Sequence, residues 1–371
     1  MNSQKNKKLS NPLLKPSEEL RVANYIFSAV EKTHKGCGRL ALMETLCDIG
    51  NRCLLVVGSS GTGKSATLRW LSTIVSRDKL WKDAITISGL KYLEKILSGQ
   101  TKTILIDDIS KAGTSYSQVM TVTCIGELVY SGFISKTTSQ MNIDISGFRG
   151  SAIINCQPLI YKRIIKADEF ETDIRDKVVR YFHIRRPIQI TIKPPENHIS
   201  YSYNYYDITL PEFILNSPLY EDTLEVFRLL FTKARAKEHL NVLLQASALL
   251  NNRPSVVKED VGLVNWLART FLIEGYITNK TDLEGARDLD VNILPILSVI
   301  ATYGKYRLTD LSVDFQVKLR RAYEIVKMNE GLVTTIFVNG ETYVIPTNAG
   351  KDILKMAGEW EEEYEQNNNN N

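Results

Sequence analysis

Short apolar runs without alternation predict strands in the first half of the chain. Residues 53–57 are Cys-Leu-Leu-Val-Val, residues 103–106 are Thr-Ile-Leu-Ile and residues 152–154 are Ala-Ile-Ile. Strands that lack apolar–polar alternation are typical of parallel sheets covered on both faces. Residues 17–34 repeat their apolar positions with helical spacing, and other helical stretches separate the strands. The pattern predicts an α/β core with a parallel sheet and flanking helices.

Two further regions follow this core. After a strand-like run at 188–192, residues 217–275 have a helical period whose buried face is Leu240, Leu243, Leu244, Ala246, Ala248 and Leu249. From residue 291, two or three helices precede two strand-like runs joined by Asn339-Gly340, a strong hairpin signal. We expect a core (16–200), a connection with a helical lid (201–280) and a small C-terminal domain (285–356), flanked by a flexible basic arm (1–15) and a disordered, acidic, Asn-rich tail (357–371).

The composition excludes several classes of protein. With 43% hydrophobic and 24% charged residues among 371, most of the chain is typical of folded domains. No apolar run approaches the roughly 18 residues that span a bilayer, and the N-terminus lacks the apolar segment of a signal peptide. The five cysteines form no Cys-x-x-Cys pair, and the four histidines are scattered. We expect a soluble protein of the cytoplasm or another reducing compartment, with no membrane partner.

The net charge of +4 conceals an uneven distribution. The last thirteen residues contain no Lys or Arg but five glutamates, Glu359, Glu361, Glu362, Glu363 and Glu365. Without these five, residues 1–358 carry a net charge of +9. The folded part is therefore basic enough for a polyanionic partner.

A phosphate-binding motif is the strongest chemical signal in the chain. Residues 58–65 match Gly-x-x-x-x-Gly-Lys-Ser, follow a predicted strand and precede a predicted helix, which is the context this motif requires. In such a loop backbone N–H groups face phosphate oxygens, Lys64 reaches the β- and γ-phosphates and the Ser65 hydroxyl binds Mg²⁺. The motif predicts a site for ATP and Mg²⁺ formed by Gly58, Ser59, Ser60, Gly61, Thr62, Gly63, Lys64 and Ser65.

Two carboxylates follow the strand predicted at residues 103–106. Asp107 and Asp108 stand where a buried strand emerges at the nucleotide end of the sheet. Asp107 is the expected Mg²⁺ partner together with Ser65, and Asp108 is placed to polarise the attacking water. The alternative is a strand followed by an Asp that caps the next helix.

These motifs resemble AAA+ ATPases over about residues 35–275. Ala152-Ile153-Ile154-Asn155 is similar to the sensor-1 strand of that family, whose final Asn contacts the γ-phosphate and the attacking water. The resemblance implies an ATPase that forms ADP and phosphate and works as a homo-oligomer, a ring or spiral with ATP between subunits. Asp108 departs from the Glu of many members, which implies slow turnover.

The same resemblance implies roles for two arginines. Residues 174–182 are similar to the family segment whose Arg reaches the γ-phosphate of the neighbouring subunit, which implies this role for Arg180, with Arg175 as the second candidate. Residues 234–261 look like the lid of the MCM and MoxR branch, which implies that Arg235, eleven residues before Ala246, is the sensor-2 arginine above the γ-phosphate. For both, the alternative is an arginine on a solvated basic face.

Residues 125–150 loosely resemble the β-hairpin that this branch places before sensor 1, and that touches DNA in some members. Lys136 would be the cation near its tip. An ordinary surface hairpin is the alternative.

Residues 291–354 look like a winged helix. The third predicted helix of this segment carries Lys318, Arg320, Arg321 and Lys327, and such a helix enters the major groove of DNA in helix-turn-helix proteins. Cations there would pair with phosphates. The alternative is a winged helix that contacts protein, because Glu324 and Glu330 dilute its positive charge.

The expected function is that of an ATP-dependent, DNA-binding AAA+ ATPase that acts as an oligomer in DNA replication or a related DNA transaction. Initiators, helicase loaders and helicase-like motors of this superfamily combine the same parts. The runner-up is a nucleotide switch of the STAND type, or a protein-remodelling ATPase, whose winged helix binds a protein client. A scaffold that binds ATP without turnover is the third hypothesis.

Overall fold

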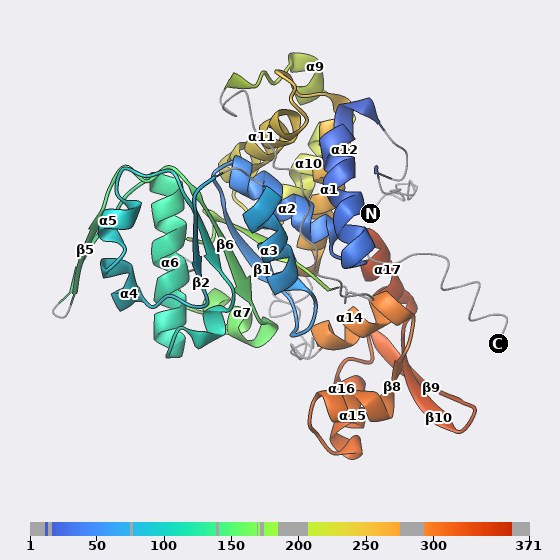
Figure 1. Cartoon of the computed structure of the whole chain (residues 1–371). Helices are drawn as coiled ribbons and strands as arrows, with labels where there is room; N and C mark the ends of the chain where they lie inside the picture. Colours follow the sequence, from blue (N-terminus) through green and yellow to red (C-terminus); the bar gives the residue numbers. More distant parts are fainter. Residues whose placement is uncertain are drawn as a thin grey trace.

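The computed structural model describes residues 12–13, 17–74, 77–138, 141–168, 170, 174–184, 207–274 and 293–357 (Figure 1). Most of the predicted arm, the strand-like run at 188–192 and all but the first residue of the predicted tail lie outside these ranges.

A parallel sheet of five strands forms the centre of the larger part. Its strand order is β2-β3-β6-β1-β7, with β1 (Cys53–Val57), β2 (Lys79–Lys82), β3 (Thr103–Ile106), β6 (Ser151–Cys156) and β7 (Val178–Phe182). The three strands predicted from apolar runs are confirmed as β1, β3 and β6. The two edge strands were not predicted, because charged residues interrupt both of them.

Helices cover both faces of this sheet, as the apolar strands require. Leu54 and Val56 of β1 belong to one buried cluster, whereas Leu55 and Val57 belong to another on the opposite face. The first cluster includes α1 (Arg21–Thr33), α2 (Gly38–Ile49) and α3 (Lys64–Ile74). The second includes α6 (Ser115–Ser131) and α7 (Pro158–Ile165). The predicted α/β core is therefore confirmed at this level.

A helical group packs against α1 and α2 on the first face of the sheet. It comprises α9 (Glu212–Leu215), α10 (Pro218–Arg228), α11 (Lys233–Leu250) and α12 (Lys258–Ala268). These helices follow all five strands of the sheet in the chain. The helical period at residues 217–275 is confirmed, and the apolar face predicted for residues 240–249 is buried.

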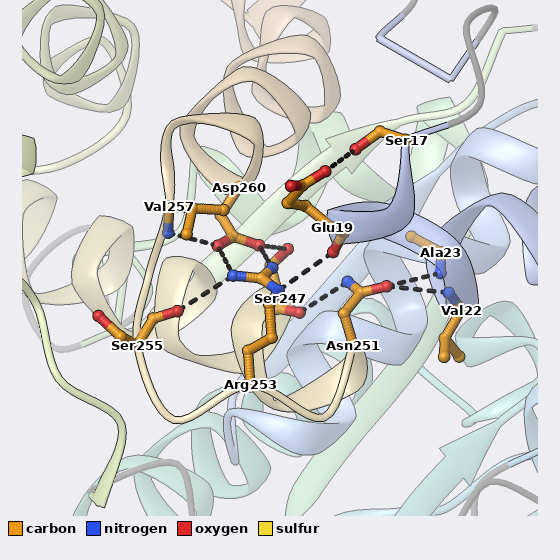
Figure 2. A network of polar contacts seen from close by, with 10 residues as sticks. All are labelled: Ser17, Glu19, Val22, Ala23, Ser247, Asn251, Arg253, Ser255, Val257 and Asp260. Atoms are coloured by element: carbon orange, nitrogen blue, oxygen red, sulfur yellow. Dashed lines mark hydrogen bonds and ion pairs between the residues drawn. The ribbon is translucent and has the colours of Figure 1, made fainter.

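A buried ion pair at the α11–α12 turn ties this helical group to the start of α1 (Figure 2). The Arg253 guanidinium donates to both carboxylate oxygens of Asp260, at 2.6 and 2.9 Å, and to the Glu19 carbonyl at 3.1 Å. The side-chain oxygen of Asn251 accepts from the first N–H groups of α1, those of Val22 at 2.9 Å and Ala23 at 3.2 Å. These bonds join segments more than 200 residues apart in the chain.

A hairpin and two short helices pack beside α6. A two-stranded hairpin, β4 (Ile134–Thr138) and β5 (Met141–Ile145), precedes β6 and packs against α6 and the short helices α4 (Ile87–Lys91) and α5 (Glu94–Leu97). The hairpin expected between residues 125 and 150 is therefore present.

The C-terminal unit combines helices with a small antiparallel sheet. Its order is α14 (Ile293–Tyr303), β8 (Tyr306–Arg307), α15 (Leu308–Asp314), α16 (Leu319–Met328), β9 (Val333–Val338), β10 (Glu341–Pro346) and α17 (Asn348–Met356). The strands lie in the order β8-β10-β9. The predicted Asn-Gly hairpin is confirmed, and both turn residues have positive φ, 50° at Asn339 and 81° at Gly340, as a two-residue turn of this kind requires.

Arg253→Ala should lower the free energy of unfolding by about 3 kcal/mol, because the Asp260 side chain is fully buried and would lose its counter-charge. Urea unfolding of the variant measures this loss. Arg320→Ala is the matched control, since Arg320 pairs with Glu324 on an exposed helix face and its loss should cost at most about 0.5 kcal/mol. Equal effects of the two substitutions would contradict the account of this network.

Candidate active site

A cavity of about 370 Å³ lies at the carboxyl ends of three adjacent strands, β1, β6 and β3. The loop after β1, Asn155 near the end of β6, and Asp107 directly after β3 all line it. The complete lining is His34, Ser60, Gly61, Thr62, Gly63, Lys64, Ser65, Ala66, Arg69, Asp107, Asp108, Lys111, Asn155, Cys156 and Gln157. The residues predicted for phosphate, Mg²⁺ and water thus meet around one cavity, except Gly58, Ser59, Arg180 and Arg235, which do not line it.

The loop between β1 and α3 has a shape that only its glycines allow. Gly61 and Gly63 have φ values of 75° and 89°, in the left-handed region that side chains disfavour. A Cβ atom at Gly58 would lie 2.6 Å from the carbonyl oxygen of His183, the residue directly after the neighbouring strand β7. The conformation of this loop, which leads into α3, therefore depends on glycine at these three positions.

Lys64 folds back onto this loop. Its ammonium donates to the carbonyl oxygens of Gly58 at 2.6 Å and Ser59 at 2.8 Å. Burial lowers the pKa of Lys64 to about 8, against the opposing effect of nearby groups that include Asp108 and Asp107. An anion in the cavity would stabilise the charged form of Lys64 and raise this pKa.

Several buried polar atoms around the cavity lack a partner within the described part of the chain. These are both polar side-chain atoms of Asn155 and the Oδ1 atom of Asp107; the hydroxyl of Ser59, beside the lining residue Ser60, is a further one. Most buried polar groups are hydrogen-bonded, so a cluster of unsatisfied ones beside a cavity fits a site for a polar ligand. These donors and acceptors suit phosphate oxygens and a hydrated Mg²⁺ ion.

A magnesium ion would need ligands beyond the protein here. Among the residues that the structure describes, no group of three or more His, Cys, Asp and Glu side chains could hold a metal ion. Ser65 and Asp107 are the two predicted ligands, and both line the cavity. Mg²⁺ commonly binds through one or two carboxylates together with substrate phosphates, so these two residues suffice only when phosphates complete its shell.

Asp108 makes the capping contact that was the alternative to its predicted role at the site. One carboxylate oxygen accepts the N–H of Ser110 at 2.9 Å and caps the short helical turn Ile109–Lys111. The other accepts from the Gln157 side chain at 3.4 Å. Asp108 also lines the cavity, so the cap holds its carboxylate in place beside the site.

His183 supports the phosphate loop from behind, and sequence reasoning missed it. Its Nε2 atom donates to the Thr62 carbonyl at 2.7 Å, and the Cys37 thiol donates to the same oxygen at 3.6 Å. These bonds hold the peptide between Thr62 and Gly63, whose N–H belongs to the predicted phosphate cradle. No motif links residues 37, 62 and 183; the pairing of β7 with β1 places His183 beside the loop, and Cys37 reaches it from the start of α2.

The prediction that Arg180 reaches a neighbouring subunit is wrong. Arg180 lies in the middle of β7 and its side chain is fully buried. The guanidinium forms an ion pair with Glu274 at 2.8 Å and donates to the Leu230 carbonyl at 2.8 Å. It therefore joins the sheet to the helical group within one chain. Arg175, the second candidate, is half-buried just before β7.

Arg235, predicted to lie above the γ-phosphate, does not line the cavity. Arg235 pairs with Glu238 at 2.7 Å, and its guanidinium lies 4.5 Å from the centre of the Tyr130 ring. Glu238 also pairs with Arg52, the residue directly before β1, at 3.0 Å. The loop at residues 58–65 follows the carboxyl end of β1, whereas Arg52 precedes its amino end. Arg235 therefore lies near the amino ends of the strands, and the cavity lies at their carboxyl ends.

Lys136 does not lie at the hairpin tip. It is half-buried in the middle of β4, opposite Ile143 of β5. Its side chain is near the Cys124 thiol of α6, where it opposes the burial that raises the pKa of this thiol. The expectation was a cation near the tip, and Lys136 stands two residues before the end of β4.

The four C-terminal cations lie on an exposed surface of α16 and at its N-cap. Lys318, Arg320, Arg321 and Lys327 are all exposed. Glu324 pairs with two of them, Arg320 at 3.4 Å and Arg321 at 3.0 Å. Their exposure leaves them accessible to an anionic partner, although the single carboxylate of Glu324 offsets one of their four positive charges.

Comparisons with known proteins give no family for this chain. No protein-family model matches the sequence, and no curated protein matches it. Within the ranges that the structure describes, no helix has the length and apolar character needed to cross a membrane. The function is therefore argued from the site itself.

Proposed function

We propose that this chain is a P-loop ATPase of the AAA+ type that binds Mg²⁺-ATP in the cavity at the carboxyl ends of β1, β6 and β3. The observation that carries the proposal is the convergence of Lys64, Ser65, Asp107 and Asn155 around one cavity. These residues come from three segments separated along the chain by whole helices. A Gly-rich turn with an incidental lysine would not account for unsatisfied polar atoms on the two neighbouring strands.

Each residue has a definite task in this proposal. Lys64 would exchange its two loop carbonyls for phosphate oxygens, at little cost because its ammonium already lies in the loop. Ser65 and Asp107 would hold Mg²⁺, which supplies charge neutralisation for the phosphates. Asn155 would donate its amide N–H toward the reacting phosphate. Asp108, held by Gln157 and Ser110, would orient and polarise the attacking water.

The homo-oligomer, as a ring or spiral, remains part of the proposal and rests on the resemblance to AAA+ ATPases. Without Arg180 and Arg235, the cations that line the cavity among the described residues are Lys64, Arg69 and Lys111. None of these is supplied by a second subunit. We therefore expect an isolated chain to hydrolyse ATP slowly, as the Asp at position 108 also implies.

The ATPase proposal is tested with two substitutions that act on different steps. Lys64→Ala should abolish ATP binding, because it removes the buried cation. Asp108→Asn should keep ATP affinity within about threefold and lower kcat by about 100-fold, since it removes only the group that activates water. Nucleotide binding by fluorescence and phosphate release measure the two effects separately.

Two outcomes would contradict this account. Retained ATP affinity in Lys64→Ala would refute the site, and unchanged low turnover in both wild type and Asp108→Asn would favour a scaffold that binds ATP without hydrolysis. Lys91→Ala, on the distant helix α4, is the control for loss of a surface lysine.

The second part of the proposal is that the C-terminal unit is a winged helix that binds DNA. In its support, a helix-rich unit carries a three-stranded antiparallel sheet, and its third helix exposes four cations. Such an ATPase fits the class of initiators, helicase loaders and helicase-like motors in DNA transactions. The alternative, a STAND-type switch or remodelling ATPase that binds a protein client, is favoured by exposed apolar side chains on the same helix, Leu319 and Tyr323.

DNA binding by α16 should depend strongly on salt. If Lys318, Lys327 and one arginine each contact a phosphate, log Kd plotted against log salt should have a slope of about 3, and Lys327→Ala should lower it by about 1. Fluorescence anisotropy with duplex DNA at several salt concentrations measures this. Lys91→Ala should leave the slope unchanged, and a wild-type slope near zero would exclude DNA as the partner.

A further inference from the structure

The tip of the hairpin β9–β10 is an exposed apolar projection. Phe337 is 74% exposed, and its neighbours Ile336 and Val338 are each 37% exposed. The turn Asn339-Gly340 follows directly, so these three residues end the strand. Figure 1 shows the hairpin extending away from the helices of the C-terminal unit. Large apolar side chains at such a tip contribute little to the folded core and suit an external contact.

The direction of Phe337 follows from the alternation along β9. Side chains two residues apart share a face of the sheet, so Phe337 lies on the same face as Thr335 and Val333. Val333 is fully buried in the core of the C-terminal unit. Because α16 packs against β9, Phe337 extends this face beyond the core on the side of the helices. The cations of α16 are exposed, away from its buried residues Ala322, Ile325 and Val326, so the aromatic ring and these cations are two separate exposed features of the same unit.

The charges near the tip do not oppose an anionic partner. The closest acid in the turn, Glu341, lies opposite Val338 on β10. It is paired with Arg307 at 2.8 Å and accepts a hydrogen bond from the Tyr343 hydroxyl at 2.7 Å. Lys305 lies 5.0 Å from the centre of the Tyr343 ring at the base of the hairpin. Arg307, on β8, also pairs with Asp310 at 3.1 Å, so the acids Glu341 and Asp310 are balanced in number by the cations Arg307 and Lys305.

We propose that Phe337 stacks on an unpaired base, so that the C-terminal unit recognises the junction between duplex and single-stranded DNA. This inference rests on the proposed DNA binding and adds the form of DNA that is recognised. The cations of α16 would hold the duplex phosphates while the hairpin tip reaches the first unpaired base. Every base has a face that can stack on an aromatic ring, so this contact needs no particular sequence.

A base is a better occupant than an apolar protein surface for two reasons. The apolar tip is narrow, formed by one ring and two aliphatic side chains, which matches the size of a base step more closely than a protein interface. The exposed cations of α16 also complement phosphates, which always accompany the bases.

The test compares wild type with Phe337→Ala, Phe337→Trp and Phe213→Ala in the full chain. Anisotropy is measured with two DNA probes of equal duplex length, one blunt and one ending in a fork of two unpaired strands. Wild type should bind the fork about tenfold more tightly than the blunt duplex, and Phe337→Ala should bind both equally, at the blunt-duplex affinity. Phe337→Trp should keep the preference, because it keeps an aromatic face.

Phe213→Ala is the matched control, since Phe213 lies on α9, outside the C-terminal unit, and is 70% exposed. It should behave as wild type. A fork preference that survives in Phe337→Ala, or is absent from wild type that binds blunt duplex, would overturn the role of Phe337 and leave the proposed DNA binding intact. Failure of wild type to bind either probe would overturn both and favour a protein partner for this unit.

Discussion

The position of β6 between β1 and β3 is the constraint on which the candidate site depends. Parallel strands end at the same edge of a sheet, so the phosphate loop after β1 and Asp107 after β3 meet across the end of β6. Asn155 of β6 pairs in register with Val56 of β1, one residue before the strand ends. With β6 between β1 and β3, the loop at residues 58–65 and the carboxylates of Asp107 and Asp108 lie on two sides of the cavity. A sheet with β1 and β3 adjacent would have no place for Asn155 between them.

Side-chain bonds around this edge keep the loop open. His183 and Cys37 hold the Thr62 carbonyl, while Lys64 occupies the inner side of the loop. The loop is therefore supported from the neighbouring strand and from the start of α2, and its curvature does not depend on a bound ligand. Such preorganisation lowers the cost of binding, because the groups are ordered before the ligand arrives. The buried polar atoms of Asp107 and Asn155 are the cost of that arrangement in the free protein.

Local patterns predicted the elements and most of the residues that line the cavity, but not the distant contacts. The apolar runs gave β1, β3 and β6, and the Gly-rich motif gave the loop, because each depends on neighbouring residues. The role of Arg180 depended on contacts with Glu274 and Leu230 that no local pattern reveals. Arg235 has suitable charge and spacing, yet its position is set by how α11 packs beside Arg52. The packing of a helix against the sheet decides which end of the strands its residues lie near. A resemblance in sequence spacing alone therefore could not predict the position of Arg235.

The most direct test of the central claim is the protonation of Lys64 when ATP binds. In the free protein the pKa of Lys64 is about 8, so roughly half of the molecules carry the proton at pH 8. Phosphate oxygens beside the ammonium would favour its charged form, so binding of Mg²⁺-ATP at pH 8 should take up about half a proton. Calorimetric titrations in two buffers with different ionisation enthalpies measure this uptake. Binding with uptake of about half a proton by the wild type, and no binding by Lys64→Ala, agrees with the account. Binding without proton uptake, or no binding heat in either buffer, would contradict it.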